Sequence, residues 1–98
     1  PTQMTLHIVS KSPYSSSALA DCLRTCGNGD AIVLIEDGVY AAQTGSEKLQ
    51  DFAGKAVFCL NADAEARGVA VTATVDEIDE ARWVALCTEY RPIVSWFK

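Results

Sequence analysis

The chain has no apolar run of the length that a membrane helix needs. None of its 98 residues belongs to a stretch approaching the ~18 apolar residues that span a bilayer. The pattern of a secretory signal, a basic start followed by a short apolar segment, is missing as well. We therefore expect a cytoplasmic protein that makes no contact with a membrane.

Positive charge is scarce and dispersed. The chain has 8 Lys and Arg against 13 Asp and Glu, which gives a net charge of −5, and its cations do not cluster in the sequence. Binding to a nucleic-acid backbone requires clustered cations that displace counterions. We therefore expect no direct contact with nucleic acid.

Paired metal ligands are also lacking. The four cysteines form no CxxC pair, and the single histidine, His7, lies inside a predicted strand. Glycine-rich phosphate-binding motifs such as GxGxxG are absent from the sequence too. We therefore expect no metal site and no cofactor. Without a secretory signal, the thiols are expected to be reduced.

What the chain does have is a regular alternation of β-prone runs and helical segments. We expect strands over 4–10, 31–35, 55–60, 75–78 and 93–97, and helices over 12–26, 39–42, 46–52, 61–67 and 80–90. This alternation predicts one α/β domain, a Rossmann-like three-layer arrangement with a mainly parallel four- to five-stranded sheet between helical layers. The domain is expected to cover residues 4–98, and residues 1–3 are interpreted as an added remnant.

Three residues have the chemistry of helix N-caps. Ser12 precedes Pro13, which suits the first helical position because its missing N–H costs nothing there. Asn61 and Asp79 precede the two later helices in the same way. We expect each of the three to begin a helix.

Three short loops are expected at the carboxyl edge of the sheet, where open parallel sheets gather function. They are residues 10–13, 36–38 and 61–63, and the first two resemble the polar rim of a small pocket or of a subunit contact. Glu36 and Asp37 are adjacent carboxylates, but turn chemistry accounts for Asp37 and Gly38 without catalysis. The sequence therefore favours a structural turn over an acid–base pair.

Cys22 is the candidate catalytic residue. A sulfur carrier needs a thiolate that accepts a sulfane sulfur as a persulfide. Cys22 also belongs to the apolar stripe of the 12–26 helix, where free cysteine is usually a buried packing residue. Both readings stay open for Cys22. Packing is the expected role of the other thiols, which are Cys26, Cys59 and Cys87.

His7 has three possible roles. Its side chain could shuttle protons, serve as a hydrogen-bonded structural group or lie at an interface, and the sequence indicates no cysteine partner for it. Large aromatic side chains gather near the end of the chain at Trp83, Trp96 and Phe97. An edge strand ending in Trp-Phe is a liability unless it is covered, so we expect a partner chain there.

Several segments, taken in order, resemble the DsrH/TusB family. The resemblance covers nearly all of residues 4–97 and is made by short motifs at the spacing of that family. The motifs are Leu6-His7, Lys11-Ser12-Pro13, Glu36-Asp37-Gly38-Val39-Tyr40-Ala41-Ala42, Leu60-Asn61-Ala62-Asp63, Ala66-Arg67-Gly68, Ile78-Asp79 and Trp96. Cys22 stands where DsrH-type members carry a cysteine in the first helix.

The resemblance implies a DsrEFH-like domain in a sulfur-relay complex. Such subunits are expected to assemble with DsrE/TusD-like and DsrF/TusC-like subunits into a heterohexamer. The TusB branch implies transfer of persulfide sulfur toward 2-thiolation of the tRNA wobble uridine, and the DsrH branch implies dissimilatory sulfur oxidation. In both branches the principal sulfur-carrying cysteine belongs to the DsrE/TusD-like subunit.

Three interpretations remain open at this point. The chain is expected to be an accessory subunit of the relay, most of all in tRNA thiolation, and it is not expected to be catalytic alone. A second interpretation makes it a carrier in its own right, with Cys22 accepting the sulfur. A third makes it a stand-alone α/β domain that binds a small molecule.

Overall fold

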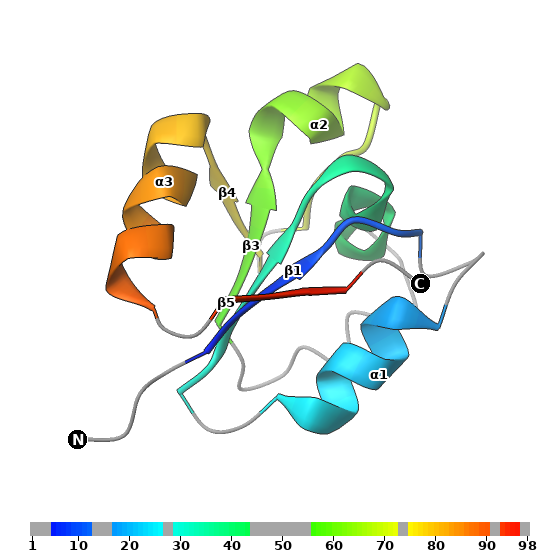
Figure 1. Ribbon diagram of the computed structural model, residues 1–98. Coiled ribbons are helices and arrows are strands. Elements are labelled where there is room, and N and C mark those ends of the chain that lie inside the picture. Colours follow the sequence, from blue (N-terminus) through cyan, green and yellow to red (C-terminus); the bar gives the residue numbers. More distant parts are fainter. Residues whose placement is uncertain are drawn as a thin grey trace.

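The chain folds around one five-stranded sheet (Figure 1). The structure is a computed structural model that describes residues 5–12, 17–26, 29–43, 56–72, 75–90 and 93–96. Its elements, in chain order, are β1 Leu6–Val9, α1 Ala18–Thr25, β2 Ala31–Leu34, the 3₁₀ helix η1 Glu36–Ala42, β3 Ala56–Leu60, α2 Asn61–Ala66, β4 Asp76–Ile78, α3 Glu80–Glu89 and β5 Ile93–Trp96.

All the strand pairs of this sheet are parallel. The strand order is β4-β3-β2-β1-β5, so the first strand of the chain lies next to the last. Leu6 pairs with Ile93 and Val9 with Trp96 in register. The α/β architecture predicted from the alternating pattern is therefore confirmed, with five strands.

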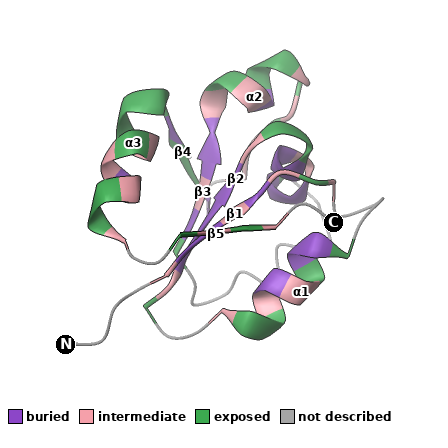
Figure 2. Cartoon of the chain, in the orientation of Figure 1, coloured by how far each residue is buried: buried purple, intermediate pink, exposed green. Residues whose placement is uncertain are grey.

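Helices cover both faces of the sheet, and each face has its own apolar core. On one face, α1 and η1 contribute Leu19, Cys22 and Val39 to a cluster with Ile32 and other strand residues. On the opposite face, Leu86 of α3 packs against strand residues that include Leu6 and Val33. The strand β2 is buried along its whole length, as expected for a continuous apolar run between two helical layers (Figure 2).

The helix starts agree only partly with the sequence-based expectations. Asp79 does cap α3, because its carboxylate Oδ1 accepts the backbone N–H of Arg82 at 2.8 Å. The expectation for Asn61 is wrong: Asn61 is the first helical residue, and Leu60 occupies the cap position without a side-chain hydrogen bond. A polar cap is dispensable there because β3 runs directly into α2.

The remaining expected boundaries lie partly outside the described residues. The described part of the first helix begins at Ala18 with Ser17 in the cap position, and residues 13–16 are outside it, so the expected start at Ser12 is not tested. The helix expected at 46–52, the remnant at 1–3 and the strand residue Phe97 also lie outside the described residues. Among the described helices, none has the length and apolar character required to cross a bilayer.

Candidate functional site

Two of the loops expected at the carboxyl edge do meet there. Asp63, in the first turn of α2, accepts the backbone N–H of Glu36 on its Oδ2 at 2.8 Å. Arg67 donates from Nε to Asp37 Oδ1 at 2.9 Å and lies 3.8 Å from Asp63 Oδ1. The hydrogen bond to Asp37 is the main reason that the pKa of Arg67 is raised. This rim is a set of mutually paired charges.

Gly38 brings the same rim against the end of β1. A Cβ atom at this position would lie 2.2 Å from the carbonyl oxygen of Val9, closer than any side chain allows. The preceding turn is also unusual, since Glu36 has a φ of +48°. These contacts explain the acidic-glycine sequence as a tight turn, the interpretation favoured from the sequence, and they offer no unpaired acid–base couple.

Cys22 belongs to the apolar core between α1 and the sheet. Its side chain has no exposed surface. Burial, followed by the nearby Cys26 and Asp30, raises the pKa of the Cys22 thiol to about 12. The thiol is therefore protonated near neutral pH, and a sulfur donor can reach it only if α1 opens locally.

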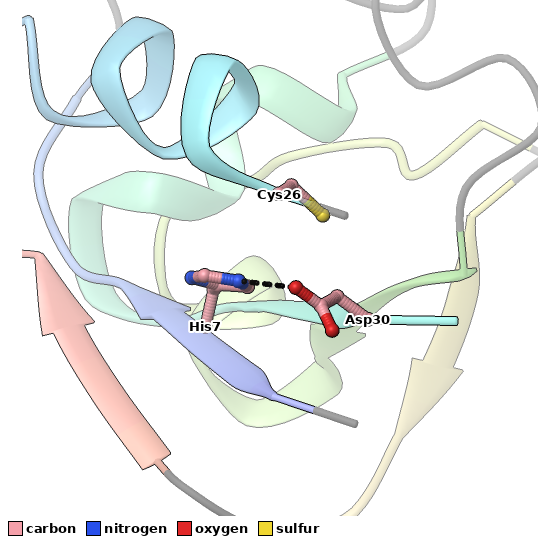
Figure 3. Close-up of side chains that lie close together, drawn as sticks. All are labelled: His7, Cys26 and Asp30. Carbon is pink, nitrogen blue, oxygen red and sulfur yellow. Dashed lines mark hydrogen bonds and ion pairs between the residues drawn. The ribbon is translucent and has the colours of Figure 1, made fainter. Parts of the chain in front are cut away.

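A group of polar side chains lies instead at the amino edge of the sheet (Figure 3). His7 is the second residue of β1, Asp30 precedes β2 directly, and Cys26 caps the carboxyl end of α1. His7 Nε2 is 3.1 Å from Asp30 Oδ2. One ligand atom from each of the three residues lies within 4.8 Å of the other two. Three separate elements therefore converge on one point, which we call the amino-edge cluster.

Trp96 fixes the hydrogen-bonding state of this cluster. Its indole Nε1, which can only donate, lies 3.1 Å from His7 Nδ1. His7 Nδ1 must then accept, so the proton of the neutral ring is on Nε2 and is donated to Asp30. The other oxygen of Asp30, Oδ1, accepts the backbone N–H of Thr5 at 2.9 Å. The histidine is only 2% exposed, and this chain of hydrogen bonds satisfies both of its nitrogens.

The amino-edge cluster corrects one expectation. The sequence indicated no cysteine near His7, whereas the structure brings Cys26 to it. The cluster lies at the edge of the sheet opposite to the three loops that the sequence singled out. The indole of Trp96 has a hydrogen-bond partner in His7 of its own chain, and the expected cover of β5 by a partner chain stays a prediction. The signal available in the sequence was weak: a lone histidine in a strand.

The other thiols and the second tryptophan take part in packing. Cys59 is buried in β3, and burial, with Glu77 and Asp63, raises the pKa of its thiol to about 12. Cys87 is half-buried and packs against the core beneath α3. Trp83 packs against the same core, and its buried Nε1 has no hydrogen-bond partner among the described residues.

The fold and these sites together define a small all-parallel α/β domain that carries buried thiols. A solved structure shares this fold: the crystal structure of the YchN protein from Escherichia coli superposes with a TM-score of 0.82, at 14% identity, over 97% of this chain and all of that chain. At this identity the likeness concerns the fold alone, and it agrees with the predicted DsrEFH-like architecture.

Sequence comparisons then identify the family. The family model described as "DsrH like protein" matches residues 11–93. "Protein TusB" of Pectobacterium parmentieri is 38% identical over 95 residues, which cover 93% of this chain and 99% of that protein. "Protein TusB" of Escherichia coli O81 (strain ED1a) is 32% identical over the same shares. The chain therefore belongs to the DsrH/TusB family, as its motifs indicated.

Proposed function

We propose that this chain is a subunit of a cytoplasmic sulfur-relay complex that passes persulfide sulfur toward 2-thiolation of the tRNA wobble uridine. The observation that carries the proposal is the similarity to TusB proteins over nearly the whole chain. The proposed partners are TusD-like (DsrE-like) and TusC-like (DsrF-like) subunits in a hetero-oligomer. The net charge of −5 supports a role that leaves the RNA to other components.

The surface near the end of the chain supports an assembled state. Val84 on α3 and Ile93 on β5 are large apolar side chains that are 61% and 43% exposed. Among the described strands, β5 is also at an edge of the sheet, and an edge strand can offer its outer backbone groups to another chain. Association with sister subunits would remove this apolar surface from water.

Within the complex we propose an accessory role, with Cys22 as the candidate carrier. Carriage would require the Cys22 thiolate to attack the terminal sulfur of a donor persulfide, which forms the Cys22 persulfide and releases the donor thiolate. The burial of Cys22 and its pKa of about 12 oppose formation of that thiolate in the closed domain. These properties support the accessory role over an independent carrier.

Sulfur loading of the assembled complex tests the role of Cys22. The complex is incubated with a persulfide donor, and the mass of each subunit is measured. We expect the additional sulfur on another subunit and the same result for Cys22→Ser. The matched control is Cys87→Ser, a half-buried thiol under the opposite face. A gain of 32 mass units, roughly one sulfur atom, on this chain that disappears in Cys22→Ser alone would make Cys22 the carrier.

The participation of the chain in a complex has its own test. Size-exclusion chromatography of the chain alone and mixed with TusC-like and TusD-like subunits should show a larger species only in the mixture. Deletion of the corresponding gene should then abolish wobble 2-thiouridine. The stand-alone binding domain would be favoured by two results together. The chain would stay a monomer that binds neither subunit, and a small molecule would raise its melting temperature.

The DsrH branch is the second candidate function. The observation in its favour is Cys22 itself, a cysteine in the first helix, together with the match to the DsrH-like family model. This branch predicts that loss of the chain impairs dissimilatory sulfur oxidation and leaves tRNA thiolation intact. Measurement of both phenotypes in one deletion strain separates the two branches.

A further inference from the structure

The amino-edge cluster has the composition of a site for a thiophilic divalent cation. Cys26 supplies a sulfur, His7 an imidazole nitrogen and Asp30 a carboxylate oxygen, and these atoms lie within 4.8 Å of one another. Thiolate and imidazole ligands favour zinc-type cations over Mg²⁺ and Ca²⁺, which prefer oxygen ligands. We propose that His7, Cys26 and Asp30 bind a zinc-type divalent cation, an activity separate from the relay of sulfur proposed above.

The existing geometry already approaches that of a metal centre. In tetrahedral coordination, two ligand atoms each ~2.05 Å from zinc are about 3.3 Å apart. His7 Nε2 and Asp30 Oδ2 are separated by 3.1 Å. Cys26 is half-buried and follows the last helical residue of α1, so its side chain can turn toward the pair without disturbing the helix.

The charges of the three ligands also balance. A Cys26 thiolate and the Asp30 carboxylate together neutralise a divalent cation, and the imidazole of His7 adds no charge. Binding releases the thiol proton of Cys26 to solvent while the Cys26 sulfur forms the metal bond. The His7 proton transfers from Nε2 to Nδ1, so the ring stays neutral and its Nε2 lone pair binds the cation.

Because of this shift of the His7 proton, the hydrogen bond from Trp96 competes with cation binding. A metal-bound His7 carries its proton on Nδ1 and must donate it to an acceptor. Trp96 Nε1 can only donate, so its hydrogen bond to Nδ1 has to break when the cation binds. Because Trp96 is half-buried, its freed N–H can be hydrated. The Trp96 hydrogen bond therefore lowers the affinity of the cluster for the cation, and the fluorescence of the indole should change when the cation binds.

The test uses the reduced full chain titrated with Co²⁺ and then with Zn²⁺. We expect a cobalt–thiolate absorption band that Zn²⁺ abolishes and that excess Mg²⁺ or Ca²⁺ leaves unchanged. Calorimetry in buffers with different ionisation enthalpies should show one proton released for each cation. The fluorescence of Trp96, measured in a Trp83→Phe background, should change in parallel. Absence of the cobalt–thiolate band would overturn the proposal.

Single substitutions locate the site. Cys26→Ser should weaken binding by more than the ~100-fold found when an outer partner of a metal ligand is removed, and Asp30→Asn should weaken it as well. The matched control Cys22→Ser alters a thiol on the same helix and should bind like the wild type. Binding that survives Cys26→Ser, or that disappears in the folded Cys22→Ser control, would contradict the assignment.

Trp96→Phe gives the sharpest outcome, because removing a native contact should improve the site. Without the indole donor, His7 Nδ1 can carry its proton and donate it to a water molecule, so cation binding should become roughly tenfold tighter, the equivalent of one neutral hydrogen bond. This change runs opposite to the loss that general destabilisation would cause. A Trp96→Phe chain that binds no more tightly than the wild type would overturn the proposed proton shift.

Discussion

Trp96 donates a hydrogen bond from its indole Nε1 to His7 Nδ1 at 3.1 Å, across 89 positions of sequence. The two residues belong to the last and first strands of the sheet, which lie side by side. Because His7 in turn donates to Asp30, the bond links β5, β1 and the start of β2. Three neighbouring strands on one side of the sheet are therefore linked by a part-buried chain of polar side chains in addition to their backbone hydrogen bonds.

The first prediction concerns this bond. Trp96→Phe keeps most of the aromatic volume but leaves His7 Nδ1 buried without a donor, which costs about 1–3 kcal/mol of the free energy of unfolding. Urea denaturation measures the change. Trp83→Phe is the matched control, because Trp83 Nε1 has no partner among the described residues and its loss removes no observed hydrogen bond. Equal losses in the two variants would mean that the bond to His7 contributes nothing.

The second prediction concerns the close approach at Gly38. Gly38→Ala places a Cβ atom 2.2 Å from the carbonyl oxygen of Val9, so the turn must move away from β1. We expect a loss of about 2–4 kcal/mol in stability, comparable to a strongly overpacked core. Gly68→Ala is the control: its φ is +66° and no atom lies within 4 Å of the added carbon. That variant should lose only about 1–2 kcal/mol from the left-handed backbone.

The third prediction follows from the pKa of Cys22. Burial raises this pKa from 9.0 to about 12 in the folded chain, so the unfolded chain loses the thiol proton at lower pH. The contribution to stability is complete below pH 9 and is lost as the pH rises toward 12. The slope from one thiol is at most about 1.4 kcal/mol per pH unit. Unfolding of Cys22→Ala between pH 9 and 11 should show a shallower decline than the wild type.

The burial that raises the pKa of Cys22 also predicts a difference in thiol reactivity. At pH 8 the native chain should be alkylated at Cys26 well before Cys22, since Cys26 is half-buried and Cys22 has no exposed surface. Peptide mass spectrometry after a short iodoacetamide pulse measures both sites. Faster labelling of Cys22 would indicate that α1 opens readily, which is the condition for sulfur carriage by this residue.

The fourth prediction separates two acidic residues of the carboxyl edge. Asp63→Ala removes the acceptor for the backbone N–H of Glu36, and this should cost about 1–2 kcal/mol of stability. Asp37→Ala removes an exposed ion pair with Arg67, which should cost less than ~1 kcal/mol. Thermal unfolding of both variants and of the wild type, at low and at high salt, measures the two losses of stability. Salt should weaken most of the Asp37 effect, but only the part of the Asp63 effect that comes from Arg67, which lies 3.8 Å from Asp63 Oδ1.

The fold was predictable because local patterns and tertiary packing agree. The run of residues 31–35 is apolar throughout, and the structure buries β2 on both faces as that pattern requires. The polar turn at residues 36–38 and the segment that contains Asp63 were likewise expected at one edge, because parallel strands end there. The structure joins them by the hydrogen bonds of Glu36 with Asp63 and of Arg67 with Asp37. The error at Asn61 has a simple origin: a good capping residue is not needed where a strand runs directly into a helix.

The amino-edge cluster could not be predicted from spacing. His7, Cys26 and Asp30 come from a strand, a helix end and a loop, and none of these segments has a metal or catalytic motif. They meet because α1 returns the chain to the start of the sheet before β2 begins. Trp96 joins them only through the pairing of β1 with β5, a long-range contact that no local pattern encodes.

The parallel pairing of β1 and β5 has a practical consequence for labelling. Since the two strands run in the same direction, β1 begins at the amino edge of the sheet and β5 ends at its carboxyl edge (Figure 1). A reporter at the start of β1 would therefore lie beside the amino-edge cluster, whereas a reporter at the end of β5 would lie next to Val9, against which Gly38 packs. Reporters at these two strand ends would follow the two edges of the sheet separately.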